Sequence, residues 1–262
     1  MKREDFFFRI VFPLKMAYTY LRAVCGGRMW GYMKTKRVFF SEAAYVFGII
    51  VLAVGTAFME RADFGMSMVV APAYLLHLKI SEYIPAFSFG MAEYCLQAVL
   101  LILLFLALRR FRPLYLFSFV TAVLYGVTLD ASIMLVGRAP SAGMWGRAVC
   151  YVAGMLLCAA GISLLFHTYI YPEVYELIVK EISAGTGKNI NVIKTCYDCL
   201  SCLVGIVLSF SFFGLWHFEG VKWGTILCAL LNGFVISRFS RALEAVFEFR
   251  DAFDLRKYFE SR

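Results

Sequence analysis

Charged residues are scarce in this chain. Only 17% of its 262 residues are Asp, Glu, Lys or Arg, whereas 61% are hydrophobic. A soluble domain normally carries about a quarter charged residues, and the mean hydropathy of +0.74 points in the same direction. The deficit of charge therefore excludes an ordinary soluble domain and indicates an integral membrane protein.

Catalytic and metal-binding signatures are lacking as well. The sequence contains no HExxH, GxSxG or P-loop motif, and it has only three histidines. Cys196, Cys199 and Cys202 recur at every third residue, but zinc and iron–sulfur sites need four ligands, and no second pair completes the set. We therefore expect no enzyme, no metal and no other cofactor. We interpret the three thiols as small residues that pack within a membrane helix.

Long apolar runs are abundant instead. They place six candidate spans, each long enough to cross a bilayer. These spans cover residues 43–60, 86–108, 114–136, 148–168, 195–215 and 221–238. The pattern predicts a multi-pass membrane protein.

The basic residues lie where they would orient such spans. Nine lysines and arginines precede the first span, and Arg109, Arg110 and Arg112 fill the loop after the second. Loops on the other side are nearly balanced in charge. This is the positive-inside pattern, and it predicts a plasma-membrane protein with both termini in the cytoplasm. The net charge of +8 then reflects topology and attraction to anionic lipid headgroups, and nucleic acid is not an expected partner.

The two terminal segments are basic and partly apolar. Residues 1–42 mix Phe and Ile with Arg and Lys, as an amphipathic helix at the membrane interface would. A solvated basic tail is the alternative. Residues 239–262 alternate apolar pairs with charges at helical spacing, which predicts a cytoplasmic helix that continues the sixth span. We expect the N-terminal segment to bind anionic headgroups, and both segments offer a docking surface for a partner subunit.

An internal repeat divides the chain into two halves. "YVFGIIVLAVG" (45–55) matches "YVAGMLLCAAG" (151–161), and three further short matches follow in the same order. The halves are thus residues 43–136 and 148–238, with three spans each. Because three is odd, the second half must cross the membrane in the opposite sense. The predicted fold is an all-α membrane protein of six helices, arranged as two inverted three-helix repeats. The glycines of the first match let neighbouring backbones approach closely: Gly48, Gly55, Gly154 and Gly161.

A segment between the first two spans is neither a loop nor a span. Residues 61–80 are too apolar for a simple loop, and Gly65 and Pro72 interrupt them too often for a full span. A short re-entrant or broken helix fits this pattern. The repeat predicts a counterpart at 171–183, with Pro172 at a plausible first helical position. A surface hairpin helix is the alternative for both copies.

Two stretches resemble a known family. "RADFGMSMVVAPAYLLH" (61–77) resembles the "RAxLGxSPWDxLH" segment of the YitT/YczE-like bacterial membrane proteins, and "VKWGTILCALLNGFVISRF" (221–239) is similar to their "GxGTxxxAxxxGxxIxxF" element. The resemblance covers about residues 43–240 and implies a duplicated six-span plasma-membrane protein without a defined activity. The chain departs from the family at Met68, Val69 and Val70, where Pro, Trp and Asp are expected, so any ligand contact there is altered or lost.

Polar residues in or beside the spans are the candidate ligands of a solute or ion, because ionisable groups in a bilayer are costly and usually face a cavity. Glu93 and Asp198 lie within one position of each other across the repeat, which predicts a carboxylate from each half near the pseudo-twofold axis. Such a pair could bind a cation or carry protons. For Asp198 a position at headgroup depth is the alternative. The other candidates are Asp130, Arg61, Asp63 and Asn232, of which Asp130 could equally lie at the interface and Asn232 could equally join two helices.

These features together predict a transporter of a small solute or ion that works by alternating access between inverted halves. The alternative is a membrane-embedded substrate-binding or accessory subunit of a partner complex, without transport of its own. Either protein could assemble as a homo-oligomer or bind a partner subunit.

Overall fold

A computed structural model describes residues 37–108, 113–137, 143–188, 190–214, 220–253 and 256. The chain divides into two units, Met1–Arg37 and Val38–Arg262. The features described below belong to the second unit. Most of the amphipathic segment predicted over residues 1–42 lies outside the described residues, as do the three arginines of the loop after the second span.

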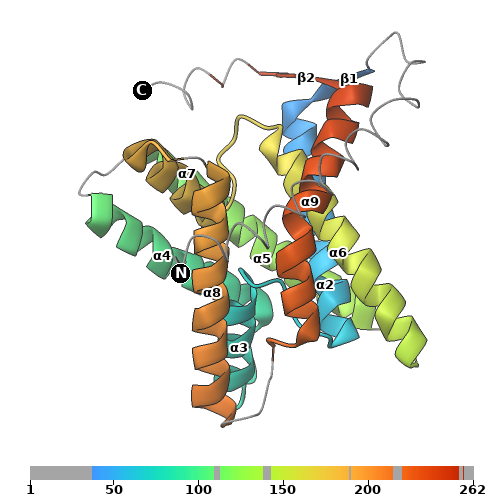
Figure 1. The fold of residues 1–262 in the computed structure, drawn as a ribbon, viewed down its shortest axis with the longest axis vertical. Coiled ribbons are helices and arrows are strands. Elements are labelled where there is room, and N and C mark those ends of the chain that lie inside the picture. Colours follow the sequence, from blue (N-terminus) through green and yellow to red (C-terminus); the bar gives the residue numbers. More distant parts are fainter. Residues whose placement is uncertain are drawn as a thin grey trace, which may run out of the picture. The chain divides into compact units, whose positions relative to one another are not determined.

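Helices make up most of the described chain (Figure 1). Two short strands, β1 (Arg37–Phe40) and β2 (Phe247–Arg250), pair with each other. A single 3-10 turn, η1 (Pro113–Tyr115), precedes α5. The helices are α2 (Ser41–Ala62), α3 (Ala71–Ser81), α4 (Phe89–Leu108), α5 (Leu116–Gly137), α6 (Met144–Phe166), α7 (Val174–Thr186), α8 (Ile190–Phe213) and α9 (Trp223–Val246).

Five of these helices, α2, α4, α5, α6 and α8, are long and apolar enough to cross a membrane. Helix α9 is a sixth if its two parts, which are bent by 46° relative to each other, count as one span. Their outer surfaces expose large apolar side chains such as Leu106, Val127 and Leu200, and a soluble protein rarely gathers such groups into wide patches. The prediction of an all-helical, multi-pass membrane protein is confirmed.

Most helix ends differ from the predicted ones by a few residues. Helix α4 begins at Phe89 because the hydroxyl of Ser88 accepts the N–H of Met91 at 3.1 Å, which caps the first turn. Helix α8 begins at Ile190, five residues early, so that Lys194 lies inside it. Helix α9 continues beyond the sixth span as expected, but it ends at Val246.

The helix predicted over residues 239–262 is therefore wrong after Val246, because Phe247–Arg250 forms a strand. These four residues alternate aromatic and charged side chains with a period of two, which suits a strand. Their aromatic rings pack against Phe39 of β1, with centroid distances of 5.3 Å from Phe247 and 5.9 Å from Phe249.

Helices α2 and α6 lie side by side and run in opposite directions (Figure 1). A Cβ atom built on Gly55 would lie 2.7 Å from the backbone nitrogen of Cys158. One built on Gly161 would lie 2.7 Å from the backbone nitrogen of Leu52. The two backbones are thus in direct contact, and only glycine fits at these crossings. The packing role predicted for the repeated glycines is confirmed.

These contacts come in exchanged pairs. The sequence match aligns Gly48 with Gly154 and Gly55 with Gly161. In the structure, Gly55 contacts Gly154 and Cys158, and its counterpart Gly161 contacts Gly48 and Leu52. In the same way Gly48 approaches Leu165, and Gly154 approaches Met59. Each of these glycine contacts therefore has a partner in which the halves exchange places.

The remaining helices repeat this pattern with one large exception. Helix α5 packs on α2 as α9 packs on α6, and α3 packs on α8 as α7 packs on α4. The exception concerns α4 and α5, which pack closely through Gly90 and Gly126. Among the described residues, α8 and α9 do not pack on each other in this way. Side chains of both helices line the cavity described below.

Two short helices follow interruptions of the chain. Helix α2 ends at Ala62 because Asp63 has a φ of 55° and Gly65 a φ of 110°, which helices do not tolerate. The chain then continues without helix to Ala71, and Pro72 lies in the first turn of α3. The predicted break within residues 61–80 is present. Helix α7 begins two residues after Pro172, with Glu173 at its N-terminal cap position.

Candidate functional site

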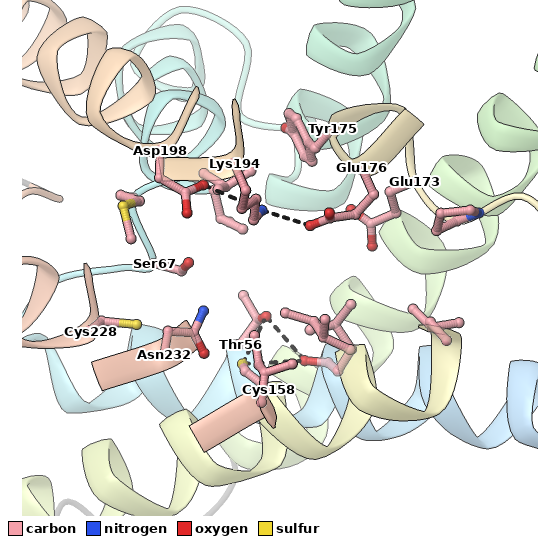
Figure 2. Close-up of a pocket in the computed structure, with 18 of the residues that line it drawn as sticks. Thr56, Ser67, Cys158, Glu173, Tyr175, Glu176, Lys194, Asp198, Cys228 and Asn232 are labelled. Atoms are coloured by element: carbon pink, nitrogen blue, oxygen red, sulfur yellow. Dashed lines mark hydrogen bonds and ion pairs between the residues drawn. The ribbon is translucent and has the colours of Figure 1, made fainter. Parts of the chain in front are cut away.

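A cavity of about 60 Å³ lies between the two halves of the chain (Figure 2). Its volume suits about four water molecules or the polar end of a small solute. The first half contributes Thr56 of α2 and Tyr125 of α5 to its wall. The second half contributes residues of α6, α8 and α9, among them Cys158, Asp198 and Asn232. A ligand that filled the cavity would therefore contact both halves.

Both interrupted segments reach this cavity. Residues 67–70, just before α3, line it on one side, and Pro172 and Glu173, just before α7, line it on another. The two short helices contact α8 at different levels. Helix α7 meets its first turns, where Glu176 binds Lys194, whereas Ala71 of α3 lies near Gly205. Non-helical backbone at this depth is tolerated where it lines a cavity.

A row of charged side chains forms one wall (Figure 2). Lys194 Nζ lies 2.7 Å from a carboxylate oxygen of Glu176 and 3.3 Å from Oδ1 of Asp198. The Asp198 contact is an ion pair by distance, but it lacks the geometry of a hydrogen bond, so Oδ1 of Asp198 has no hydrogen-bond partner. One lysine therefore balances two carboxylates in this wall.

Neutral polar groups form the opposite wall. The hydroxyl groups of Thr56 and Tyr125 are 2.9 Å apart, and the Cys158 thiol lies 3.7 Å from Thr56 Oγ1. Thr56 also donates to the carbonyl oxygen of Leu52, one turn earlier in α2, at 3.1 Å. Asn232 of α9 completes this wall, and its Oδ1 is buried without a hydrogen-bond partner.

Glu173 connects the cavity to a second buried carboxyl group, that of Glu93. Gln97 donates from Nε2 to Glu173 at 3.2 Å and to Glu93 at 3.3 Å. Tyr175 donates to the same oxygen of Glu93 at 2.9 Å. Glu93 itself does not line the cavity and is connected to it only through these neighbours in the described structure.

Burial raises the pKa of Glu173 well above its usual range, and the negative charges of Glu93 and Glu176 raise it further. The hydrogen bond from Gln97 and the charge of Lys194 act against this shift but do not cancel it. Burial also raises the pKa of Tyr175, so its phenol group stays neutral and remains a donor. The wall of the cavity thus contains a carboxyl group that favours its protonated form.

The structure brings three of the six predicted site residues together. Asp198 and Asn232 line the cavity, and Glu93 lies behind Glu173. Asp130 lies elsewhere, because its carboxylate accepts the hydroxyl of Ser88 at 2.5 Å and the backbone N–H of Gly90 at 2.8 Å. That carboxylate thus stabilises the positive end of the α4 dipole.

The two candidates beside the interrupted segment also lie away from the cavity. Arg61 belongs to the last turn of α2 and does not line the cavity. Asp63 forms ion pairs with Arg147 at 2.9 Å and with Lys222 at 2.5 Å. These bonds join the end of α2 to the starts of α6 and α9. In this structure Asp63 therefore ties helix ends together.

Sequence reasoning missed several residues of the site: Lys194, Glu173, Glu176, Thr56 and Tyr125. For Lys194 a signal existed, because Asp198 follows it by four residues and would share its face of a helix. Because the fifth span was predicted to begin at residue 195, Lys194 was assigned to the preceding loop and its spacing from Asp198 was not considered. For the others no local pattern distinguishes a residue of the cavity wall from one in ordinary helix packing.

The three closely spaced cysteines of α8 are free thiols. Cys196 and Cys199 are exposed and Cys202 is half-buried, so the prediction that they pack inside the helix bundle is wrong for the first two. They point outward from a helix of which little is buried by the rest of the chain. Among the described residues, no three His, Cys, Asp or Glu side chains are placed to hold a metal ion.

Comparison with known proteins places the chain in a family. A family model described as a family of unknown function, DUF6198, matches residues 39–241, which include both halves of the repeat and every cavity residue. No curated protein and no solved structure matches the chain. The matching model does not carry the YitT/YczE name, so that resemblance stays a prediction. By the extent of this match, this multi-pass membrane protein is a member of the DUF6198 family.

Proposed function

We propose that this protein is a transporter of a small solute or ion in the plasma membrane, working by alternating access between two inverted halves. The observation that carries the proposal is the cavity, whose mostly apolar wall holds a few charged and polar side chains and which both halves and both interrupted segments line. Secondary transporters built from inverted repeats hold their substrates at such an interface, beside short or broken helices.

The exchanged contacts of α2 and α6 support the inverted relation. A two-fold axis makes any contact between residue i of one half and residue j of the other recur with the halves exchanged. Gly55 with Cys158 and Gly161 with Leu52 follow this rule, and the two helices are antiparallel. The resemblance to the duplicated YitT/YczE-like proteins favours the same arrangement.

The chemistry of the wall suits reversible binding, and we propose no covalent step. The carboxylates of Glu176 and Asp198 and Oδ1 of Asn232 provide acceptor oxygen atoms in this wall, so they favour a solute that carries N–H or O–H donors or a positive charge. The charged side chains on α7 and α8 belong to the second half of the chain, and the neutral ones on α2 and α5 belong to the first. Movement of one half relative to the other would therefore separate these two walls of the cavity.

A binding and flux assay tests the proposal. Purified protein is heated in the presence of a panel of small amines, amino acids, sugars, anions and metal cations, and a bound solute is expected to raise the unfolding temperature. The stabilising solute is then followed into proteoliposomes. Asn232→Leu should weaken its apparent affinity by about tenfold, because one hydrogen bond from the solute is lost.

Thr128→Val serves as the matched control for this variant. Thr128 is half-buried on α5, does not line the cavity, and its hydroxyl bonds only to the carbonyl oxygen of Leu124, one turn earlier, in the described structure. Its replacement should leave affinity unchanged. If sealed proteoliposomes show no flux for any class in the panel, the transport proposal fails, and a membrane-embedded accessory subunit becomes the better account.

The inverted topology makes a separate prediction about α3 and α7. The segment that holds α3 should face the outside and the one that holds α7 the cytoplasm, with both termini also cytoplasmic. In a cysteine-free background, the Tyr83→Cys variant should react with an impermeant maleimide added to intact cells. The Ala184→Cys variant should react only after permeabilisation. Both positions are exposed, so burial does not limit the reaction.

The basic residues of the two segments do not decide this assignment, because Arg61 and Lys79 lie in the first segment and Lys180 and Lys188 in the second. The assignment follows from the number of spans between the segments, so the labelling experiment tests it directly. Equal labelling of both variants from outside would show that α3 and α7 lie on the same side. The halves would then not be inverted.

A further inference from the structure

Two carboxyl groups in the interior share one amide. Gln97 of α4 donates from Nε2 to Oε2 of Glu93 at 3.3 Å and to Oε2 of Glu173 at 3.2 Å. Its Oε1 accepts the backbone N–H of Val174 at 3.1 Å. This bond orients the amide, because its nitrogen then faces both carboxyl groups. Tyr175 donates to the same oxygen of Glu93 at 2.9 Å.

These donors serve only one oxygen of each carboxyl group. Oε1 of Glu93 and Oε1 of Glu173 are buried and have no hydrogen-bond partner. Glu93 is 0% exposed and Glu173 is 7% exposed. An ionised carboxylate needs donors at both oxygens, and a buried oxygen without one is costly. A proton on either group removes one charge and supplies an O–H donor.

Nearby charges do not balance two ionised carboxylates. In the described part of the chain, no ion pair joins Glu93 or Glu173 to a lysine or arginine. Lys194 of α8 acts on Glu173 electrostatically, but its contacts at 2.7 Å and 3.3 Å are with Glu176 of α7 and Asp198. The other titratable groups that face the pair are neutral near pH 7: Tyr45 of α2, Tyr125 of α5, Cys158 of α6, Tyr175 of α7 and, behind Tyr175, Tyr197 of α8.

We propose that Glu93, Gln97 and Glu173 form a proton-binding site in which the two carboxyl groups share one proton at neutral pH. Two buried negative charges held by one amide repel each other, so such a pair loses its protons in two well-separated steps. Glu173 lines the cavity and Glu93 does not. The shared proton therefore exchanges with the cavity through Glu173.

This site makes the proton the coupling ion of the transporter, and this step alone rests on the proposed function. With the pair singly protonated and the proton on Glu173, the wall carries one positive charge, on Lys194, and two negative charges, on Glu176 and Asp198. Release of the proton into the cavity adds a third negative charge. A cationic solute would then bind as the proton leaves, which is the basis of an exchange.

Infrared spectroscopy tests the proton site without any solute. Purified protein in lipid should show a C=O stretch from a protonated carboxyl group at about pH 7, shifted on transfer to D2O. Glu93→Gln and Glu173→Gln should each lose this band, because the remaining carboxyl group no longer faces a second negative charge. Glu82→Gln changes a carboxylate exposed at the surface and should leave the band intact.

The unfolding temperature, measured as a function of pH, provides a second test that remains informative if a variant folds poorly. The raised pKa of Glu173 means that the folded state holds its proton more tightly than the unfolded chain does. This contribution to stability is complete below the unfolded value of about 4.3, and it is lost as pH rises through the raised folded value. Glutamine mimics the protonated group, so Glu173→Gln should flatten this part of the pH profile.

The outcomes separate the proton site from transport. A band that is absent from the wild type, or that survives in both glutamine variants, overturns the proton site. A band that behaves as expected supports it even where no solute crosses the membrane, and absence of flux then counts against the transporter alone. If a solute is transported, a pH gradient should drive its uptake in the wild type but not in Glu173→Gln, and gradient-driven uptake in that variant would overturn the coupling.

Discussion

Gly55→Leu is expected to prevent the chain from reaching its folded state. The Cβ of any other residue would lie 2.7 Å from the backbone nitrogen of Cys158 and 2.8 Å from the carbonyl oxygen of Gly154. Backbone atoms cannot turn aside as a side chain can, so α2 and α6 would have to separate. We expect a loss larger than the roughly 1–3 kcal/mol of ordinary overpacking, measured as the fraction of monodisperse protein after extraction and as its unfolding temperature.

The exchanged contacts of α2 and α6 extend this prediction to Gly161, the counterpart of Gly55. Gly161→Leu should be as damaging as Gly55→Leu, because its Cβ would meet the backbone of Leu52 at the same distance of 2.7 Å. Gly233→Leu is the matched control, since nothing lies within 4 Å of its Cβ position in the transmembrane helix α9. That variant should fold as well as the wild type. Normal yields of the Gly55 or Gly161 variant would contradict the close crossing of the two helices.

The sequence predicted a close approach of backbones at these glycines, but not which helices meet there, because its signals are local. A run of apolar residues long enough for a bilayer marks a membrane helix by itself, and the matching glycines of 45–55 and 151–161 mark two equivalent helix faces. The break after α2 was also visible, since Gly65 and Pro72 each interrupt a helix for a local reason. Such features need no knowledge of which segments meet in space.

The errors arise where distant segments meet. Strand β2 forms beside β1, from which it is separated by about two hundred residues of sequence, so helical spacing after residue 239 gave no warning of it. Glu173 was assigned to a short surface helix or a re-entrant one, yet its partner Gln97 belongs to the other half. Asp130 was expected near a solute, but the start of α4 holds its carboxylate. Each contact depends on packing between elements that the sequence does not pair.

The charged wall of the cavity is the other place where one substitution should have a large effect. Lys194 lies between Glu176 and Asp198, and the three side chains are 27%, 18% and 19% exposed. Lys194→Met leaves two largely buried carboxylates without a counter-charge. Removal of one partner from a buried ion pair typically costs about 3–5 kcal/mol, so the unfolding temperature should fall steeply.

Two further variants separate charge balance from loss of packing. Lys79→Met breaks a pair of similar length at the surface, 2.6 Å from Glu82, and should change the unfolding temperature little because solvent screens that pair. The triple variant Lys194→Met/Glu176→Gln/Asp198→Asn removes the unbalanced charges and should recover most of the lost stability. If Lys194→Met costs no more than Lys79→Met, the lysine does not stabilise the wall. The triple variant would also keep the fold while removing the charged side chains of the cavity, so a solute held by them should no longer raise its unfolding temperature.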